Sequence, residues 1–218
     1  MLKTERMDRV RAALRAQGLT QMIVCDPKSV WYLTGVAVEP YERLLALYLP
    51  TEGEPVLFLN RLFNVPEPPC RTVWHTDTDK PVAQIAEVVD AGRPLGIDKE
   101  WPAKFLIPLM ETHPGMQVVL SSDCVDDCRA CKDAEEQALM REASRINDAV
   151  NEAAKHYIKA GMTEREVAEF IDAQFRAHGC EEPSFTTIVS FGANAADPHH
   201  EPDDTVLKEG DCVLFDMG

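Results

Sequence analysis

The chain has 218 residues, of which 45% are hydrophobic and 27% are charged, and its formal net charge at pH 7 is -15. These values suit one large or two small globular domains, and the negative charge argues against nucleic acid or an anionic membrane surface as a partner. No stretch is apolar enough to span a membrane, and the charged amino terminus lacks the apolar core of an export signal, so a cytoplasmic location is expected.

Strands and helices alternate through the first part of the chain. An amphipathic helix is predicted from Glu5 to Gln17, and further helices are predicted near 81–90 and 102–112. Short apolar runs bounded by Pro, Gly or Asp predict buried strands between them. These runs cover residues 22–25, 44–49, 55–59, 94–98 and 116–120. The alternation indicates an α/β domain over residues 1–125.

The pattern changes over residues 126–218. A long helix is predicted with Asp133 in its first turn, and apolar residues at steps of three and four form one face of it. This face consists of Leu139, Ala143, Ile146, Val150, Ala153 and Tyr157. Thr163 and Glu166 have the spacing of a capping box, which predicts a second helix. Two strands, residues 185–191 and 212–216, are predicted after it with a polar loop between them.

The stretch CVDDCRAC contains a group of three cysteines, Cys124, Cys128 and Cys131. The CxxxCxxC spacing is that of radical enzymes that bind a four-iron cluster, because thiolates are suitable ligands for such a cluster. Those enzymes, however, carry the motif early in a large barrel, and here little chain follows it. We interpret the segment as a linker between domains with free thiols, and a zinc or redox role remains the alternative.

Two further features concern polar residues near the end of the sequence. His199 and His200 lie in a loop, residues 194–204, that has no Lys or Arg, which disfavours phosphate binding. Adjacent residues of an extended chain point in opposite directions and rarely bind one ion, so a polar surface loop is the alternative to a metal site. Asp216 ends an apolar strand that we interpret as buried, where a carboxylate needs a partner or a metal ion, unless the strand end is solvated.

The stretch SFTTIVSFGANAADPHHEPDDTVLKEGDCVLFDMG, residues 184–218, resembles the pita-bread metallopeptidases, which include the Xaa-Pro dipeptidases and aminopeptidases. The stretch SVWYLTG, residues 29–35, is similar to an amino-terminal turn of that family, and RACKDAEEQALMREASRINDA is similar to the entry into its catalytic domain. The resemblance implies a creatinase-like α/β domain over residues 1–125. It also implies the first half of a pita-bread (α+β) catalytic domain over residues 126–218.

The resemblance also implies a mechanism and a set of site residues. The family uses two divalent cations, manganese, cobalt or zinc, and a hydroxide that bridges them hydrolyses the bond between an amino-terminal residue and proline. Of the five metal ligands, the first would be Asp216. His199 would lie near the substrate and stabilise the reacting carbonyl as a catalytic residue, whereas His200 has no counterpart that we can assign.

The other four metal ligands would lie beyond Asp216. The resemblance therefore implies that the chain is truncated after the first ligand, that it holds no metal and that it is inactive by itself. The full-length parent is expected to be a homodimer that acts on proline-containing peptides. Two alternatives stay open, namely a creatinase-like hydrolase that works without metal, and a non-catalytic dimerisation or binding module.

Overall fold

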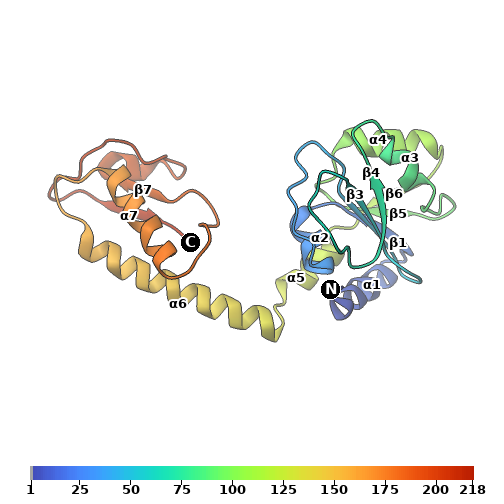
Figure 1. The fold of residues 1–218 in the computed structure, drawn as a ribbon, viewed down its shortest axis with the longest axis horizontal. Helices are drawn as coiled ribbons and strands as arrows, with labels where there is room; N and C mark the ends of the chain where they lie inside the picture. The colour runs from blue at the N-terminus through green and yellow to red at the C-terminus, as the bar shows by residue number, and fades with distance from the viewer. Residues whose placement is uncertain (1) are drawn as a thin grey trace. The chain divides into compact units, whose positions relative to one another are not determined.

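The computed structural model describes residues 2–218, which divide after Cys131 into two separate units. The first unit contains a six-stranded sheet in the order β4-β3-β2-β1-β5-β6 (Figure 1). The strands are β1 (Gln21–Val24), β2 (Ala46–Pro50), β3 (Val56–Asn60), β4 (Arg71–His75), β5 (Leu95–Ile97) and β6 (Val118–Leu120). Strand β2 is antiparallel to both of its neighbours, and the other pairs are parallel.

Helices cover both faces of this sheet (Figure 1). The helices are α1 (Thr4–Ala16), α2 (Pro27–Thr34), α3 (Pro81–Ala86), α4 (Ala103–Thr112) and α5 (Asp123–Ala130). Successive residues of a strand point to opposite faces, so Met22 and Val24 of β1 pack with α1, α2 and α5. Ile23 and Cys25 pack on the other face with α3 and α4. The predicted α/β architecture is therefore confirmed.

Three elements of this unit, α2, β4 and α5, were not predicted. Helix α2 occupies the segment that the sequence analysis interpreted as a turn, and that interpretation is wrong. The Asp26 side chain accepts hydrogen bonds from the Lys28 and Ser29 amides, Pro27 begins the helix, and Gly35 ends it in the left-handed conformation. Strand β4 was missed because it lies at the edge of the sheet and is only partly buried, so its sequence shows no continuous apolar run.

The cysteine-containing segment is a helix of the first unit, so its interpretation as a linker is wrong. Helix α5 places Cys124, Val125 and Cys128 in the core that it shares with α1 and α2. The Tyr32 hydroxyl and an Arg9 guanidinium N–H both donate to the Cys128 carbonyl oxygen. The boundary was expected near residues 121–132 and was drawn after residue 125, whereas the structure divides after Cys131 because all of α5 packs on the first unit.

The second unit has two helices beside a two-stranded antiparallel sheet. Its elements are α6 (Ala134–Tyr157), α7 (Glu164–Ala177), β7 (Ile188–Phe191), the short 3₁₀ helix η1 (Gly192–Ala196) and β8 (Val213–Asp216). The capping box predicted at Thr163 and Glu166 is confirmed, and Asp133 forms a second one at the start of α6. The core contains Val150, Ala154, Val167, Ile171, Phe175, Val189, Phe191 and Leu207.

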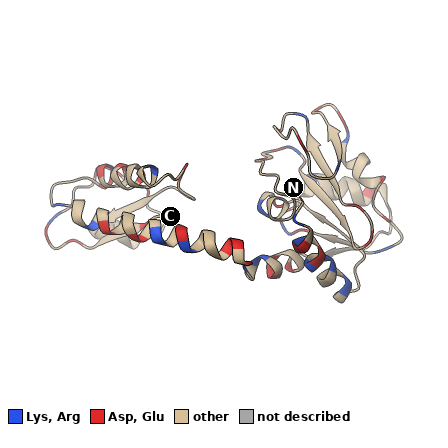
Figure 2. Cartoon of the chain, turned by 60° about the horizontal axis from the view of Figure 1, so that its bottom comes forward, with Lys and Arg blue, Asp and Glu red and all other residues tan. Residues whose placement is uncertain are grey.

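Helix α6 is buried only in its carboxyl-terminal half. Val150 and Ala154 are fully buried, and Tyr157 stacks on Phe170 of α7 with ring centroids 3.8 Å apart. Leu139, which the predicted apolar face includes, is 65% exposed, so that prediction fails for the first turns of the helix. Figure 2 shows acidic and basic residues along α6. No helix within residues 2–218 has the length and apolar character that crossing a membrane requires.

Candidate functional site

The polar residues of the second unit gather around the beginning of α7. Glu164 is the first residue of this helix and its side chain is completely buried. The amino-terminal end of a helix favours a negative charge because its first amides have no partner within the helix. A buried carboxylate still requires hydrogen bonds to replace those that it made with water. Glu164 obtains these from the last residue of β7 and from the loop between β7 and β8.

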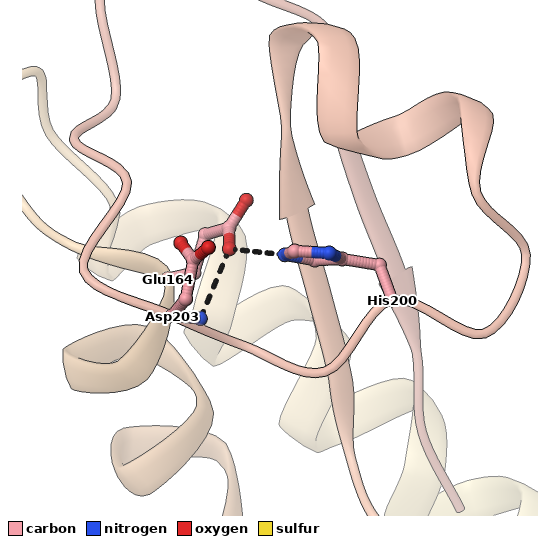
Figure 3. Close-up of side chains that lie close together, drawn as sticks. All are labelled: Glu164, His200 and Asp203. Carbon is pink, nitrogen blue, oxygen red and sulfur yellow. Dashed lines mark hydrogen bonds and ion pairs between the residues drawn. The ribbon is translucent and has the colours of Figure 1, made fainter.

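Each carboxylate oxygen of Glu164 accepts two hydrogen bonds. Oε1 accepts from the Phe191 amide at 2.7 Å and from Nδ2 of Asn194 at 3.0 Å. Oε2 accepts from the Asp203 amide at 3.1 Å and lies 2.7 Å from Nε2 of His200 (Figure 3). One side chain therefore joins the end of β7, the turn that follows it and the far side of the loop.

His200 is partly buried next to Glu164, with its side chain 16% exposed. The hydrogen bond that the His200 imidazole donates to Glu164 raises the pKa of this imidazole, and burial opposes the rise in part. The nearby carboxylates of Asp203 and Asp197 raise this pKa further. The pKa of Asp203 is lowered, chiefly because its carboxylate accepts hydrogen bonds from Thr205. The protonated imidazole is thus favoured beside a charged carboxylate.

Within residues 2–218, Glu164, His200 and Asp203 form the only group of three potential metal ligands, with donor atoms within 4.8 Å of one another. Glu164 is not available as a ligand in this arrangement, because both of its oxygens are already occupied by donors. Nε2 of His200 carries the proton that it shares with Oε2, whereas a metal ligand must present a free lone pair. The geometry is that of a hydrogen-bonded anchor.

His199, the predicted catalytic residue, lies in the loop after η1 and is exposed. Its backbone amide donates to Oδ1 of Asp197 at 3.0 Å, and the imidazole makes no hydrogen bond within residues 2–218. Whereas His200 is held against Glu164, His199 presents its ring to solvent. The two neighbouring histidines thus differ in burial and in partners, although His199 lies in a turn and not in the extended chain that was expected.

Asp216, the predicted metal ligand, is the last residue of β8 and lies opposite Ile188 of β7. Strand β8 is only half-buried and Asp216 is exposed, so the interpretation of a buried strand with an expensive carboxylate is wrong. An exposed carboxylate is the kind of oxygen donor that hard divalent cations accept. Within residues 2–218, however, no cluster of three potential ligands includes Asp216, and one carboxylate does not make a centre for two ions.

The cysteines of α5 belong to the core of the first unit. Burial raises the pKa of the Cys124 thiol to about 11, and it also raises the pKa of Cys128. Both thiols therefore stay protonated near neutral pH, whereas metal ligands and nucleophiles are thiolates. Cys131 is exposed just beyond the end of the helix.

The structure reveals an anchor that the sequence analysis missed. Glu164 stands inside the predicted capping box, but nothing near it in the sequence indicates that its side chain is buried. His200 is 36 residues away along the chain, so no periodic or local pattern links the two. The adjacent histidines were expected to point in opposite directions on an extended chain, whereas the structure has a turn at His199.

Comparison with known proteins shows which families the two units match. The family described as "Creatinase/Prolidase N-terminal domain" matches residues 6–131, and "Metallopeptidase family M24" matches residues 138–218. An uncharacterized peptidase of Staphylococcus epidermidis is 29% identical over 213 residues. The alignment with this peptidase covers 96% of the chain and 60% of the relative.

Solved structures with the same fold include a dipeptidase, PepE, from Mycobacterium ulcerans, with 30% identity and a TM-score of 0.88. A prolidase from Thermococcus sibiricus has 28% identity and a TM-score of 0.90. These matches cover 99% and 100% of this chain, and 60% and 62% of the other chains. The present chain thus spans about 60% of the length of the relatives that it matches.

Proposed function

Because this chain belongs to the creatinase/prolidase N-terminal domain family over residues 6–131 and matches metallopeptidase family M24 over residues 138–218, we propose that the whole protein hydrolyses the bond between an amino-terminal residue and a following proline. The observation that carries this proposal is the similarity to a prolidase over the entire chain, at 28% identity and a TM-score of 0.90. Water adds to the carbonyl carbon, the C–N bond breaks, and the proline nitrogen takes a proton. The substrate class is thus a short peptide with proline in the second position.

His199 is the residue of this chain that we assign to the reacting carbonyl. Its imidazole is exposed and makes no hydrogen bond within residues 2–218, so one ring N–H is free to donate a hydrogen bond to a carbonyl oxygen. Such a bond strengthens as negative charge develops on that oxygen during attack by water. His199 would therefore favour the transition state over the bound peptide.

Asp216 is the residue of this chain that we assign to metal binding. Divalent cations, when bound, would supply Lewis-acid polarisation of the carbonyl and activation of water. The exposed carboxylate of Asp216 provides one oxygen ligand, and further ligands are needed to hold two ions. We therefore expect the 218-residue chain alone to have no peptidase activity.

The test compares this chain with an extended protein, meaning the same sequence continued to the length of its relatives. Both are incubated with manganese, cobalt or zinc and an Xaa-Pro dipeptide, and a dipeptide with alanine in place of proline serves as the control substrate. We expect the extended protein to cleave only the proline substrate, and Asp216→Ala to abolish cleavage together with metal binding.

Other results would contradict parts of the proposal. Equal cleavage of the alanine dipeptide would contradict the proposed specificity for proline. Cleavage of neither dipeptide by the extended protein would favour a hydrolase of another class on the same scaffold. Turnover by the 218-residue chain that Asp216→Ala abolishes would show that this chain holds a complete metal centre, against the ligand assignment.

A further inference from the structure

The loop between β7 and β8 is fixed on both sides of the exposed His199. Before it, Nδ2 of Asn194 donates to Glu164 and to Oγ1 of Thr205. After it, the next residue, His200, bonds Oε2 of Glu164. Only residues 195–199 lie between these two attachment points. Within this short segment, a carboxylate oxygen of Asp197 accepts a hydrogen bond from the His199 amide and so stabilises a turn.

Hydrogen-bond chemistry decides how His200 is attached. An amide nitrogen has two protons, and Nδ2 of Asn194 directs them to Glu164 and Thr205. Its 3.1 Å approach to Nε2 of His200 is therefore not a third donation, and Nε2 is free to carry its own proton. That proton lies between Nε2 and Oε2 of Glu164, which are 2.7 Å apart. His200 acts as the donor of a charge-assisted hydrogen bond, which is stronger than a neutral one.

We propose that Glu164 and His200 form a positioning anchor that holds His199 in the orientation that its role at the scissile carbonyl requires. This proposal deepens the proposed function and rests on it for the catalytic role of His199. His200 does not touch the substrate in this scheme. Its imidazole faces Glu164 of α7 and the carboxylates of Asp197 and Asp203 in its own loop.

The anchor matters because a free loop samples many backbone conformations. Ordering the backbone of one residue costs about 1–2 kcal/mol of conformational free energy. The segment of residues 195–199 therefore needs stabilising hydrogen bonds at its ends to keep one conformation. Glu164 supplies the attachment from a helix, which is more rigid than a loop. An exposed side chain such as His199 gains a defined position only when the backbone beneath it is held.

The first experiment measures loop order in the 218-residue chain by amide hydrogen exchange. In His200→Ala, we expect the Phe191 and Asp203 amides to exchange about 10- to 100-fold faster, the range for losing a hydrogen bond to a charged group. In His200→Gln, a side-chain amide replaces the ring donor, and most of the protection should return. His199→Gln is the matched control, and it should leave these amides unchanged because the His199 ring makes no such bond.

The second experiment measures kinetics in the extended protein with a saturating Xaa-Pro substrate. His200→Ala should lower kcat about 10-fold with little change in KM, because misplacing a catalytic group lowers the rate more than it weakens binding. His200→Gln should recover most of this loss. Metal content should be the same in all variants.

The two experiments separate failure of the anchor from failure of the proposed function. Unchanged exchange in His200→Ala would overturn the anchor, whatever the activity. Faster exchange with an unchanged kcat would overturn the positioning role, and a kcat loss without faster exchange would assign His200 a direct role instead. An extended protein without Xaa-Pro cleavage would refute the proposed function, whereas the exchange result would still decide whether the anchor exists.

Discussion

At the residue scale, Glu164 shows how a charge can be buried at little cost. Its carboxylate sits at the start of α7, where the helix dipole favours it, and it accepts two backbone and two side-chain hydrogen bonds. A carboxylate that loses one of these donors keeps the cost of desolvation without the compensation. The residues that bond Glu164 therefore depend on one another, and the effects of substituting them on the free energy of unfolding should not be additive.

The exposed His199 should matter for activity and not for folding. In the extended protein, His199→Ala should lower kcat about 10²- to 10³-fold, the range for losing one donor to a developing oxyanion. Steady-state kinetics and metal analysis of the purified variant check this. Loss of metal from His199→Ala would instead indicate that this residue is a metal ligand. A decrease in kcat no larger than that of His200→Ala would contradict a direct role of His199 at the carbonyl.

His200 should make the stability of the 218-residue chain depend on pH. Its pKa is raised in the folded state, so protonation of this residue stabilises the fold. The contribution is fully present below the unfolded pKa of about 6.5 and is lost as the pH rises through the folded pKa. The free energy of unfolding of the wild type, relative to His200→Gln, should therefore be larger at about pH 5.5 than at about pH 9.

Urea denaturation of both proteins at the two pH values measures this difference. His199→Gln is the control, because the exposed His199 ring makes no hydrogen bond within residues 2–218 and this variant keeps the pair of His200 with Glu164. A difference between wild type and His200→Gln that is constant with pH, or that grows toward alkaline pH, would contradict the pair with Glu164.

At the element scale, α5 is the clearest change from the sequence interpretation. Most of a motif with metal-binding spacing lies in an amphipathic helix, in which Cys124 and Cys128 are four residues apart and share one buried face. Arg129 on the same helix bonds Asp26 and Ser29 at the start of α2. The helix thus connects the end of the first unit to the helix that follows β1.

Substitutions in α5 should separate a core role from a ligand role. Cys128→Ser places a hydroxyl where a buried thiol packs, which should lower the free energy of unfolding by about 1–3 kcal/mol. Cys131→Ser, at an exposed position, should change it by less than about 0.5 kcal/mol. Urea denaturation checks both, together with iron and sulfide analysis of the anaerobically purified protein. Similar losses in both variants, or bound iron that either one removes, would support a cluster.

At the scale of the whole molecule, the two units have separate cores. The core of the first unit lies on both faces of a twisted sheet, and the core of the second lies between α6, α7 and the β7–β8 pair. The structure divides them after Cys131, so α5 completes the first unit and α6 begins the second. Each unit therefore has the contacts that a folding unit needs.

A protein of residues 1–131 should fold by itself and unfold in one cooperative transition. A shorter protein of residues 1–125 is the matched comparison, because it lacks most of α5 and with it the Cys128 carbonyl that accepts from Tyr32 and Arg9. We expect the shorter protein to melt at a clearly lower temperature. Calorimetry of both proteins measures this, and equal melting temperatures would place the boundary near residue 125.

The sequence by itself determined the elements whose signals are local. The α/β alternation of the first unit, the capping box at Thr163 and the start of the helix at Asp133 all follow from residues a few positions apart. Such signals are readable because helix caps and strand alternation act over one or two turns of the chain.

Only the tertiary structure decided which of these side chains are buried and with what. Glu164 and His200 meet across 36 residues, Cys128 enters a core built by α1 and α2, and the first turns of α6 stay exposed although their pattern is apolar. Burial depends on which elements pack together, and this is a property of contacts distant in sequence. A local pattern carries no information about such contacts, so only the folded structure shows the hydrogen bond between Glu164 and His200 next to His199.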